Sequence, residues 1–495
     1  MRHVLAIDQG TTGTTCLVID ADGRVAGRGY REITQHYPQP GWVEHDPEEL
    51  FTATMDAARQ AVATAGATPD AIGITNQRET VVVWDRRTGQ PAARAIVWQD
   101  RRTAARCREL APQAESIARR TGLVVDPYFS ATKLEWLLAK GLGERAARGE
   151  LLAGTVDSWL VWRLTGGAVH ATEPTNASRT LLYDIDRRAW SEEQCALFGV
   201  PAAMLPEVRP SAGEFGCTMP ELFGRAVPIT GVAGDQQAAL FGQGCWRRGE
   251  SKQTYGTGAF LLLNTGDQRP EAAPGVLTTL ACDCDGRPAY ALEGAILVAG
   301  AAIQWLRDGL GILAEAAESE ELARSVPSTD GVYFVPALTG LGAPDWEPRA
   351  RGTIVGLTRG TGRAHLARAA LEAMAYATAD VLALMHERSG AAGDGAPLRV
   401  DGGASANDWL MQFQADVLGR AVERPDMIET TALGAAGLAG IAAGVWPAAD
   451  RFLARRSFAR FTPSAGAAAA RGGAAEWRRA VRAALAWARD VHDQD

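Results

Sequence analysis

The sequence lacks any run of apolar residues long enough to cross a membrane. Its longest such run, residues 432–446, is rich in glycine and alanine, whereas a spanning helix needs about 20 apolar residues. The run is instead typical of a buried helix packed closely against a neighbour. The chain also reaches Asp8 before the apolar part of a signal peptide could be complete, so we expect no export signal and a cytoplasmic location.

An excess of positive charge is missing too. The 50 Lys and Arg residues against 58 Asp and Glu give a formal net charge of −8, which argues against a nucleic-acid-binding surface. The seven cysteines form no disulfide framework, and we interpret them as reduced thiols. The only close pair, Cys282 and Cys284, has no partner pair at metal-ligand spacing, so we expect a hairpin end there.

The length of the chain predicts two domains. A chain of 495 residues exceeds what one hydrophobic core usually supports, and we expect the domains to be residues 1–244 and 245–495. Strand-like runs alternate with helical patterns, which indicates an α/β fold. Strands are expected at residues 71–75, 80–84 and 227–232, and helices at residues 366–388, closed by Gly390, and 409–418.

The most informative motif is DQGTTGTT at residues 8–15, between two strand-like runs. Gly10 and Gly13 let the backbone approach a ligand closely, so that N–H groups and threonine hydroxyls can converge on phosphate oxygens. Asp8 can reach a metal ion that rides on those phosphates. From this motif alone, a phosphate-binding hairpin and an ordinary Gly/Thr hairpin both remain open.

A second Gly/Thr-tipped hairpin, Gly256-Thr257-Gly258, follows about half a chain later. A third glycine site, Gly402-Gly403, ends a strand and precedes a helix, where a nucleotide can lie against the helix N-terminus. Three such sites in this order predict two similar domains that close on one phosphate chain. The arrangement resembles the actin-like ATPase superfamily, which also holds sugar kinases and chaperone ATPases.

Other segments are left unexplained by nucleotide binding. Arg78 and Glu79 follow a strand, and their donor fork and acceptor can hold adjacent hydroxyls of a polyol; a surface ion pair is the alternative. Trp98 can pack against the CH groups of a ligand or in the core. Tyr128 can reach a ligand through its hydroxyl or serve as a buried structural tyrosine.

Asp235 stands where a strand passes through Gly234 into a helix. It either caps the helix or acts as a general base, because phosphoryl transfer from ATP to an alcohol needs a carboxylate that accepts the hydroxyl proton. Gln236 beside it offers a second polar contact. In this mechanism Asp8 holds Mg²⁺, mostly through water, and closure of the cleft excludes water as a competing acceptor.

Taken together, these segments resemble the FGGY carbohydrate kinases, and within that family the branch that acts on glycerol. NQRE, DPYFS and GDQQ are specific to that branch. The motifs occur in family order from residue 8 to about residue 440: DQGTT, GITNQRET, IVWQ, TGLVVDPYFSATK, TNASRT, GDQQAALFGQ, TYGTG, ALEGA, TGLGAP, GLTRG, RVDGGA and TALGAA.

This resemblance implies two actin-like (ribonuclease H-like) domains with an ATP cleft between them. It implies the ATP- and Mg²⁺-dependent phosphorylation of glycerol to sn-glycerol 3-phosphate, in glycerol uptake and catabolism, by a homodimer or homotetramer. Asp235 is then the base. The implied glycerol contacts are Arg78, Glu79, Tyr128, Asp235 and Gln236, with Trp98 and Phe260 packing on the carbon chain. The implied nucleotide contacts are Thr11, Thr12, Gly13, Thr257, Gly300, Gln304, Gly403 and Asn407, with Asp8 at the metal.

The chain departs from that pattern at two places. Several members carry an arginine where this chain has Thr15, so we expect weaker nucleotide binding. Bacterial members regulated by fructose bisphosphate have a Gly-rich, Arg-bearing loop before the GDQQ strand, of which only Arg225 is present here. We therefore expect fructose bisphosphate to inhibit poorly or not at all.

Two alternatives to a glycerol-phosphorylating enzyme remain open, namely a kinase for another small polyol or ketose and a non-catalytic nucleotide-switch protein. The C-terminal tail adds little to this choice. Residues 463–476 are mostly Ala, Gly and Ser and predict a mobile linker or a fraying helix that buries little surface. Residues 477–487 predict a short amphipathic helix that docks on its own domain rather than on a membrane.

Overall fold

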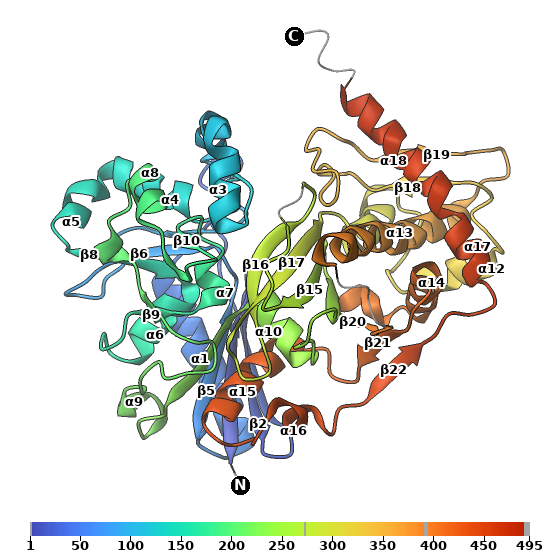
Figure 1. Ribbon diagram of the computed structural model, residues 1–495. Coiled ribbons are helices and arrows are strands. Elements are labelled where there is room, and N and C mark those ends of the chain that lie inside the picture. The colour runs from blue at the N-terminus through green and yellow to red at the C-terminus, as the bar shows by residue number, and fades with distance from the viewer. Residues whose placement is uncertain (1, 272–273, 391–394, 490–495) are drawn as a thin grey trace.

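The structure is a computed structural model that describes residues 2–271, 274–390 and 395–489 (Figure 1). One half of the molecule is built on a five-stranded sheet of order β13-β5-β1-β2-β3. In this sheet β1 and β2 form the predicted first hairpin, and β1, β5 and β13 run parallel. The strands are His3–Gln9 (β1), Gly13–Asp20 (β2), Val25–Glu32 (β3), Ala71–Asn76 (β5) and Ile229–Gly234 (β13).

The other half contains a seven-stranded sheet of order β16-β17-β15-β14-β20-β21-β22. Its inner strands β17-β15-β14-β20-β21 repeat the pairing of β3-β2-β1-β5-β13, with two antiparallel pairs followed by two parallel pairs. The predicted α/β fold with two similar halves is therefore confirmed. The strands are Ser251–Tyr255 (β14), Ala259–Gly266 (β15), Leu277–Cys282 (β16), Pro288–Ile296 (β17), Leu398–Asp401 (β20), Val422–Pro425 (β21) and Phe458–Phe461 (β22).

The first half also carries an additional layer with a four-stranded sheet, β4-β7-β6-β8, of which β6, β7 and β8 lie between β5 and β13 in the chain. The short strands are Glu44–His45 (β4), Val81–Asp85 (β6), Ala95–Ile96 (β7), Leu151–Thr155 (β8), Ala171–Thr172 (β9), Tyr183–Asp184 (β10), Ala189–Trp190 (β11), Glu207–Val208 (β12) and, in the second half, Tyr333–Val335 (β18) and Thr353–Val355 (β19). As expected, Cys282 ends a strand, and a tight turn follows in which the Asp283 N–H donates to the Arg287 carbonyl.

The helices cover the sheets of both halves. In the first half they are Pro47–Ala65 (α1), Ala104–Glu109 (α2), Ala114–Thr121 (α3), Ala131–Leu137 (α4), Gly143–Ala147 (α5), Val156–Leu164 (α6), Pro174–Ala177 (α7), Glu192–Leu197 (α8), Pro220–Phe223 (α9) and Asp235–Gly242 (α10). Later in the chain they are Gly300–Gln304 (α11), Glu318–Ser325 (α12), Arg363–Ser389 (α13), Asp408–Leu418 (α14), Thr430–Ala442 (α15), Ala449–Leu453 (α16), Ala467–Gly472 (α17) and Ala474–Arg489 (α18). No helix in these described ranges combines the length and apolarity that crossing a bilayer requires.

Helix α15 crosses from the second half of the chain to the sheet of the first half. It lies against β1, β5, β13 and α10 (Figure 1), and buries a cluster with Val4, Ala6, Leu17 and Ile19. Its small residues permit this approach, since a Cβ on Gly73 of β5 would lie 2.1 Å from the Ala435 carbonyl oxygen. The expected close-packed helix is confirmed, while the domain boundary at residue 244 stays a prediction.

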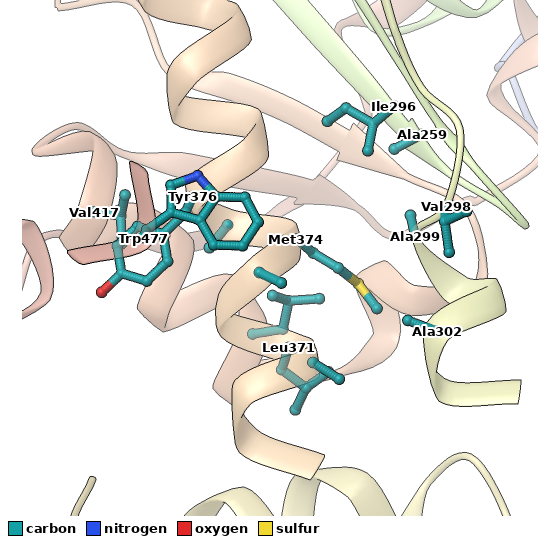
Figure 2. Packing of buried hydrophobic residues seen from close by; sticks show 14 of the residues in the cluster. Ala259, Ile296, Val298, Ala299, Ala302, Leu371, Met374, Tyr376, Val417 and Trp477 are labelled. Carbon is teal, nitrogen blue, oxygen red and sulfur yellow. The ribbon is translucent and has the colours of Figure 1, made fainter. Parts of the chain in front are cut away.

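The C-terminal tail is more ordered than its composition suggests. Tyr376 on α13 and Trp477 on α18 stack with ring centroids 5.9 Å apart (Figure 2), and Trp477 Nε1 donates to Asp380 Oδ2 at 2.9 Å. Docking of this helix on its own half is therefore confirmed. Residues 463–476 form α17 and the start of α18. The expectation that this stretch buries little surface is confirmed, because within it only Ala467 and Ala470 are buried.

We predict that Gly434→Ala destabilises the protein by about 1–3 kcal/mol, the usual cost of overpacking a core. A Cβ at this position of α15 would lie 1.8 Å from the backbone oxygen of Ala238 on α10, and backbone cannot move aside cheaply. Thermal unfolding measures the effect. The control is Gly472→Ala at the end of α17, which meets nothing within 4 Å and should leave the melting temperature unchanged or slightly raised. Equal effects of the two variants would contradict the prediction.

Candidate active site

The tip of the first hairpin presents hydroxyls to solvent. The Gly10 N–H donates to the Gly13 carbonyl at 2.9 Å, and Gly13 cannot carry a side chain because a Cβ would lie 2.6 Å from the Arg31 carbonyl oxygen. Thr12 is exposed at the tip. Thr11 is half-buried and accepts a hydrogen bond from Trp98 Nε1 at 2.9 Å. The hairpin that we expect to hold phosphates therefore directly contacts the expected acceptor site.

The second hairpin meets the N-terminus of α11. The N–H of Gly300 donates to the Gly256 carbonyl at 3.0 Å, and that of Ala301 to the Thr257 carbonyl at 3.1 Å. Gly402 lies against the same hairpin with a φ of +82°, and a Cβ there would lie 2.2 Å from the Tyr255 carbonyl oxygen. The structure thus brings together the hairpin tip, the start of α11 and the Gly-Gly turn.

The remaining residues that are predicted to contact the nucleotide lie near the second hairpin, the start of α11 and the Gly-Gly turn. Gly403 is exposed, with open space where a Cβ would be, and borders a pocket of about 530 Å³. Gln304 is exposed on α11. Asn407 has a structural role as well, since its side chain accepts from the Leu410 N–H at 2.8 Å and caps α14. Their contacts with a nucleotide stay predictions.

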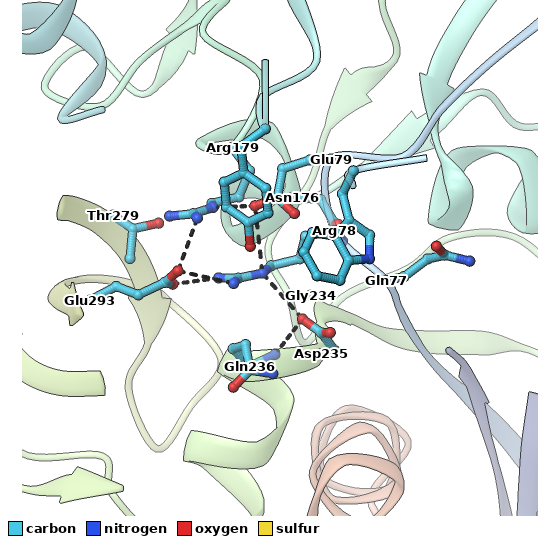
Figure 3. A network of polar contacts seen from close by, with 12 residues as sticks. Gln77, Arg78, Glu79, Asn176, Arg179, Gly234, Asp235, Gln236, Thr279 and Glu293 are labelled. Carbon is cyan, nitrogen blue, oxygen red and sulfur yellow. Dashed lines mark hydrogen bonds and ion pairs between the residues drawn. The ribbon is translucent and has the colours of Figure 1, made fainter. Parts of the chain in front are cut away.

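Arg78 lies in a buried network rather than in a surface ion pair (Figure 3). Its side chain is 2% exposed, and its guanidinium donates to both carboxylate oxygens of Glu293, at 2.6 and 3.1 Å. Nη1 also donates to Gln237 Oε1 at 3.1 Å, and Nε lies 3.1 Å from Asp235 Oδ1. The surface-pair alternative was wrong because this turn is covered by β17 of the other half.

Glu79 belongs to the same network through Arg179. Its backbone has a φ of +63°, a conformation in which its side chain turns to accept from Arg179 Nε at 2.6 Å. Arg179 Nη2 donates in turn to Glu293 Oε1 at 2.9 Å. Burial alone would raise the pKa of Glu293, but the attraction of Arg179 and Arg78 outweighs it and holds that pKa at about 2.

Aromatic side chains lie beside these charges. Trp98 and Tyr128 are half-buried and meet edge to face, with ring centroids 5.4 Å apart. Phe260 on β15 is also half-buried. Its neighbours along the strand, Ala259 and Leu261, belong to the hydrophobic core of the second half. Because alternate residues of a strand face opposite sides, its ring points away from that core. All three aromatic residues therefore keep exposed surface that a carbon chain can cover.

Asp235 is the first residue of α10, and Gly234 rather than Asp235 holds the cap position. The helix-cap alternative was therefore wrong. Asp235 Oδ1 accepts from the Gln236 N–H at 2.7 Å, and its side chain is 32% exposed, far more than that of Arg78. Gln236 Oε1 accepts from Lys252 Nζ of β14 at 2.6 Å. Burial raises the pKa of Asp235, and the positive charge of Arg78 opposes that rise.

The residues around Asp8 suit a divalent cation. Burial, with the negative charge of Asp235 as a second cause, raises the pKa of Asp8 to about 7. A cation beside Asp8 would relieve this repulsion. No group of three or more His, Cys, Asp or Glu side chains suited to a metal occurs in the described residues. Mg²⁺ is usually bound through one or two carboxylates together with substrate phosphates and water.

Several residues of the site were not predicted. Glu293, Arg179, Lys252 and Gln237 bind predicted residues directly, and Glu293 contacts Arg78 from 215 positions away. Glu293 and Arg179 lie in the quoted motifs ALEGA and TNASRT, where nothing local reveals their partners. The usable signal is the lone charged residue inside an otherwise apolar strand, as at Glu293 in β17; the polar sequence of β14 gives no such signal for Lys252.

The comparisons with known proteins decide the family. Models of the FGGY family of carbohydrate kinases match residues 3–242 with their N-terminal domain and residues 252–443 with their C-terminal domain. The chain belongs to this family. A relative from Carboxydothermus hydrogenoformans, named glycerol kinase, is 54% identical over 98% of this chain and 99% of its own. Glycerol kinase from Methylobacterium nodulans is 54% identical over 97% of each chain.

A solved FGGY structure agrees with these relatives. The crystal structure of Plasmodium falciparum glycerol kinase with ADP superimposes with a TM-score of 0.92, at 35% sequence identity, over 98% of each chain. The two-domain actin-like fold is thereby established for the present chain.

We predict that Asp8→Asn stabilises the ligand-free protein more at pH 8 than at pH 5. Because the pKa of Asp8 is raised by folding, its contribution to stability is fully present in acid and is lost as the pH rises through about 7. Asparagine cannot ionise, so the difference in melting temperature between variant and wild type should grow over that range. Asp450→Asn, an exposed control, should give the same difference at both pH values. A difference for Asp8→Asn that does not change with pH would contradict the assignment.

Proposed function

We propose that this chain phosphorylates glycerol with ATP, giving sn-glycerol 3-phosphate and ADP. The observation that carries the proposal is the placement of Arg78, Glu79 and Asp235 in one network, while the first Gly/Thr hairpin is hydrogen-bonded to Trp98, another of the predicted glycerol contacts. A planar donor fork and a carboxylate can hold adjacent hydroxyls. The relatives at 54% identity, which carry the name glycerol kinase over nearly the full chain, support the same substrate.

Asp235 acts as the general base. Its carboxylate is the most exposed acid of the network, and Arg78 favours its ionised form. It accepts the proton of the attacking hydroxyl while the γ-phosphoryl group moves in line. Tyr128 and Gln236 complete the glycerol contacts, and Trp98 and Phe260 cover the carbon chain.

The nucleotide lies between the halves in this mechanism. Thr11, Thr12 and Thr257 donate to the β- and γ-phosphates, and Asp8 binds Mg²⁺, which neutralises phosphate charge when bound. The other nucleotide contacts are Gly13, Gly300, Gln304, Gly403 and Asn407. Closure excludes water and favours transfer to glycerol over hydrolysis.

Further expectations accompany this proposal. We place the enzyme in the cytoplasm, as a dimer or tetramer that binds neither nucleic acid nor membrane. Weaker nucleotide binding caused by Thr15 stays a prediction; Thr15 pairs with Asp8 across β1 and β2. Insensitivity to fructose bisphosphate also stays a prediction. In the structure, Arg225 is already engaged in an ion pair with Asp70 at 3.1 Å.

We predict that ADP release is fastest with glycerol among small acceptors. The panel comprises glycerol, dihydroxyacetone, erythritol, xylulose and ribulose, each at saturating Mg·ATP, with product identified by mass. A ketose or another polyol as the best acceptor would replace glycerol in the proposal. Equal, slow release across the panel would instead favour a nucleotide switch.

We also predict that Asp235→Asn lowers kcat with glycerol by roughly 10²-fold or more, the usual contribution of a general base. Asparagine keeps the size of the side chain but cannot accept the proton. Calorimetry should find glycerol and nucleotide binding largely retained. An unchanged kcat would remove Asp235 from the chemical step.

A further inference from the structure

The acceptor site contains a residue from the other half of the molecule. Glu293 lies on β17, which pairs with β15 and β16 of the second sheet, whereas Arg78 and Glu79 follow β5 of the first. The Glu293 side chain is 1% exposed, and both of its oxygens accept from Arg78 (Figure 3). The conformation of Arg78 is thus set from across the interface between the halves.

The contact with Glu293 determines which N–H donors of Arg78 remain available. A guanidinium has five N–H groups. Two from Nη1 go to Glu293 and Gln237, and one from Nη2 goes to Glu293. The Nε–H faces Asp235 without hydrogen-bond geometry, and one Nη2 N–H is left. Glu293 therefore fixes the guanidinium plane and, with it, the direction of the two N–H groups that remain available.

Glu293 acts on Glu79 as well, through Arg179. The Arg179 side chain is fully buried and joins the two glutamates, with Nε donating to Glu79 and Nη2 to Glu293. Its guanidinium also lies 5.7 Å from the ring centre of Tyr128. One carboxylate of the second half therefore fixes two of the side chains proposed to bind glycerol, Arg78 directly and Glu79 through one arginine.

The surrounding interface is built to hold this arrangement. Strand β16 packs on α7 and α10 of the first half, where Thr279 Oγ1 lies 3.2 Å from Ser178 Oγ and Gln237 donates to the Leu280 carbonyl at 2.9 Å. By contrast, Thr12 and Thr257 at the two hairpin tips are exposed. The halves are thus firmly joined on the acceptor side.

We propose that Glu293 is a positioning residue for the acceptor, which orients Arg78 directly and Glu79 through Arg179, so that the glycerol site is complete only when β17 is docked on the first half. This inference rests on the proposed function. A purely structural role is the alternative. Removing one partner of a buried ion pair is destabilising in either case, so the two roles are distinguished by glycerol binding and not by stability.

The test is the kinetics of Glu293→Gln. Gln keeps the shape but puts an N–H where one oxygen accepted, so Arg78 loses its paired acceptor. Hydrogen bonds to charged groups contribute enough that we expect the KM for glycerol to rise roughly tenfold or more, while the KM for ATP stays within about twofold. Calorimetric titration with glycerol in the absence of ATP should give the same loss.

Glu423→Gln is the matched control. Glu423 is also a buried glutamate that bridges two arginines, Arg399 and Arg460, but within the second sheet. The Glu423→Gln variant should change the melting temperature without changing the KM for glycerol. A glycerol KM for Glu293→Gln within twofold of wild type, or an equal rise of both KM values, would overturn the inference.

Two further variants keep the test decisive if Glu293→Gln folds poorly. Glu293→Asp retains the charge at a shorter reach, and Glu293→Gln combined with Arg179→Met removes one charge of each sign. Both should recover stability yet keep a raised KM for glycerol; recovery of KM together with stability would overturn the positioning role. A wild-type enzyme inactive on glycerol would contradict the proposed function itself, whereas an active one with unaffected variants contradicts only this inference.

Discussion

The buried contact between Arg78 and Glu293 is the interaction on which the acceptor site depends. A charge removed from water is costly unless it is paired and hydrogen-bonded, and here two arginines and two glutamates alternate in contact. Arg78 and Glu293 come together from 215 positions apart in the chain. The same contact therefore satisfies the charges, joins the halves and aligns the proposed substrate contacts.

The electrostatics of Asp8 and Asp235 differ from those of the paired charges around Arg78 and Glu293. Burial, and after it the negative charge of Asp235, raises the pKa of Asp8. Burial also raises the pKa of Asp235, but Arg78 and Lys252 oppose that rise. The ligand-free site is thus short of positive charge beside Asp8 and supplied with it beside Asp235. That asymmetry suits a metal at one carboxylate and proton transfer at the other.

What the sequence predicted well depends on neighbours along the chain. Both hairpins, the end of α13 at Gly390 and the helix that starts at Asp235 follow from turn residues and local patterns. Partners across the interface could not be predicted, because a lone glutamate in a strand does not indicate which arginine it will meet. Composition was less specific at α17, where small side chains left a linker and a fraying helix open and the structure has a mostly exposed helix at Ala467–Gly472.

The crossing of α15 has a consequence for how the molecule forms during synthesis. The apolar face made by Val4, Ala6, Leu17 and Ile19 is covered by Ala432, Leu433, Ala436 and Ala439. A ribosome that has released only the first half leaves this face open to water and to other nascent chains. The first sheet can therefore acquire its full core only after nearly nine-tenths of the protein has emerged, so the two halves mature as one unit.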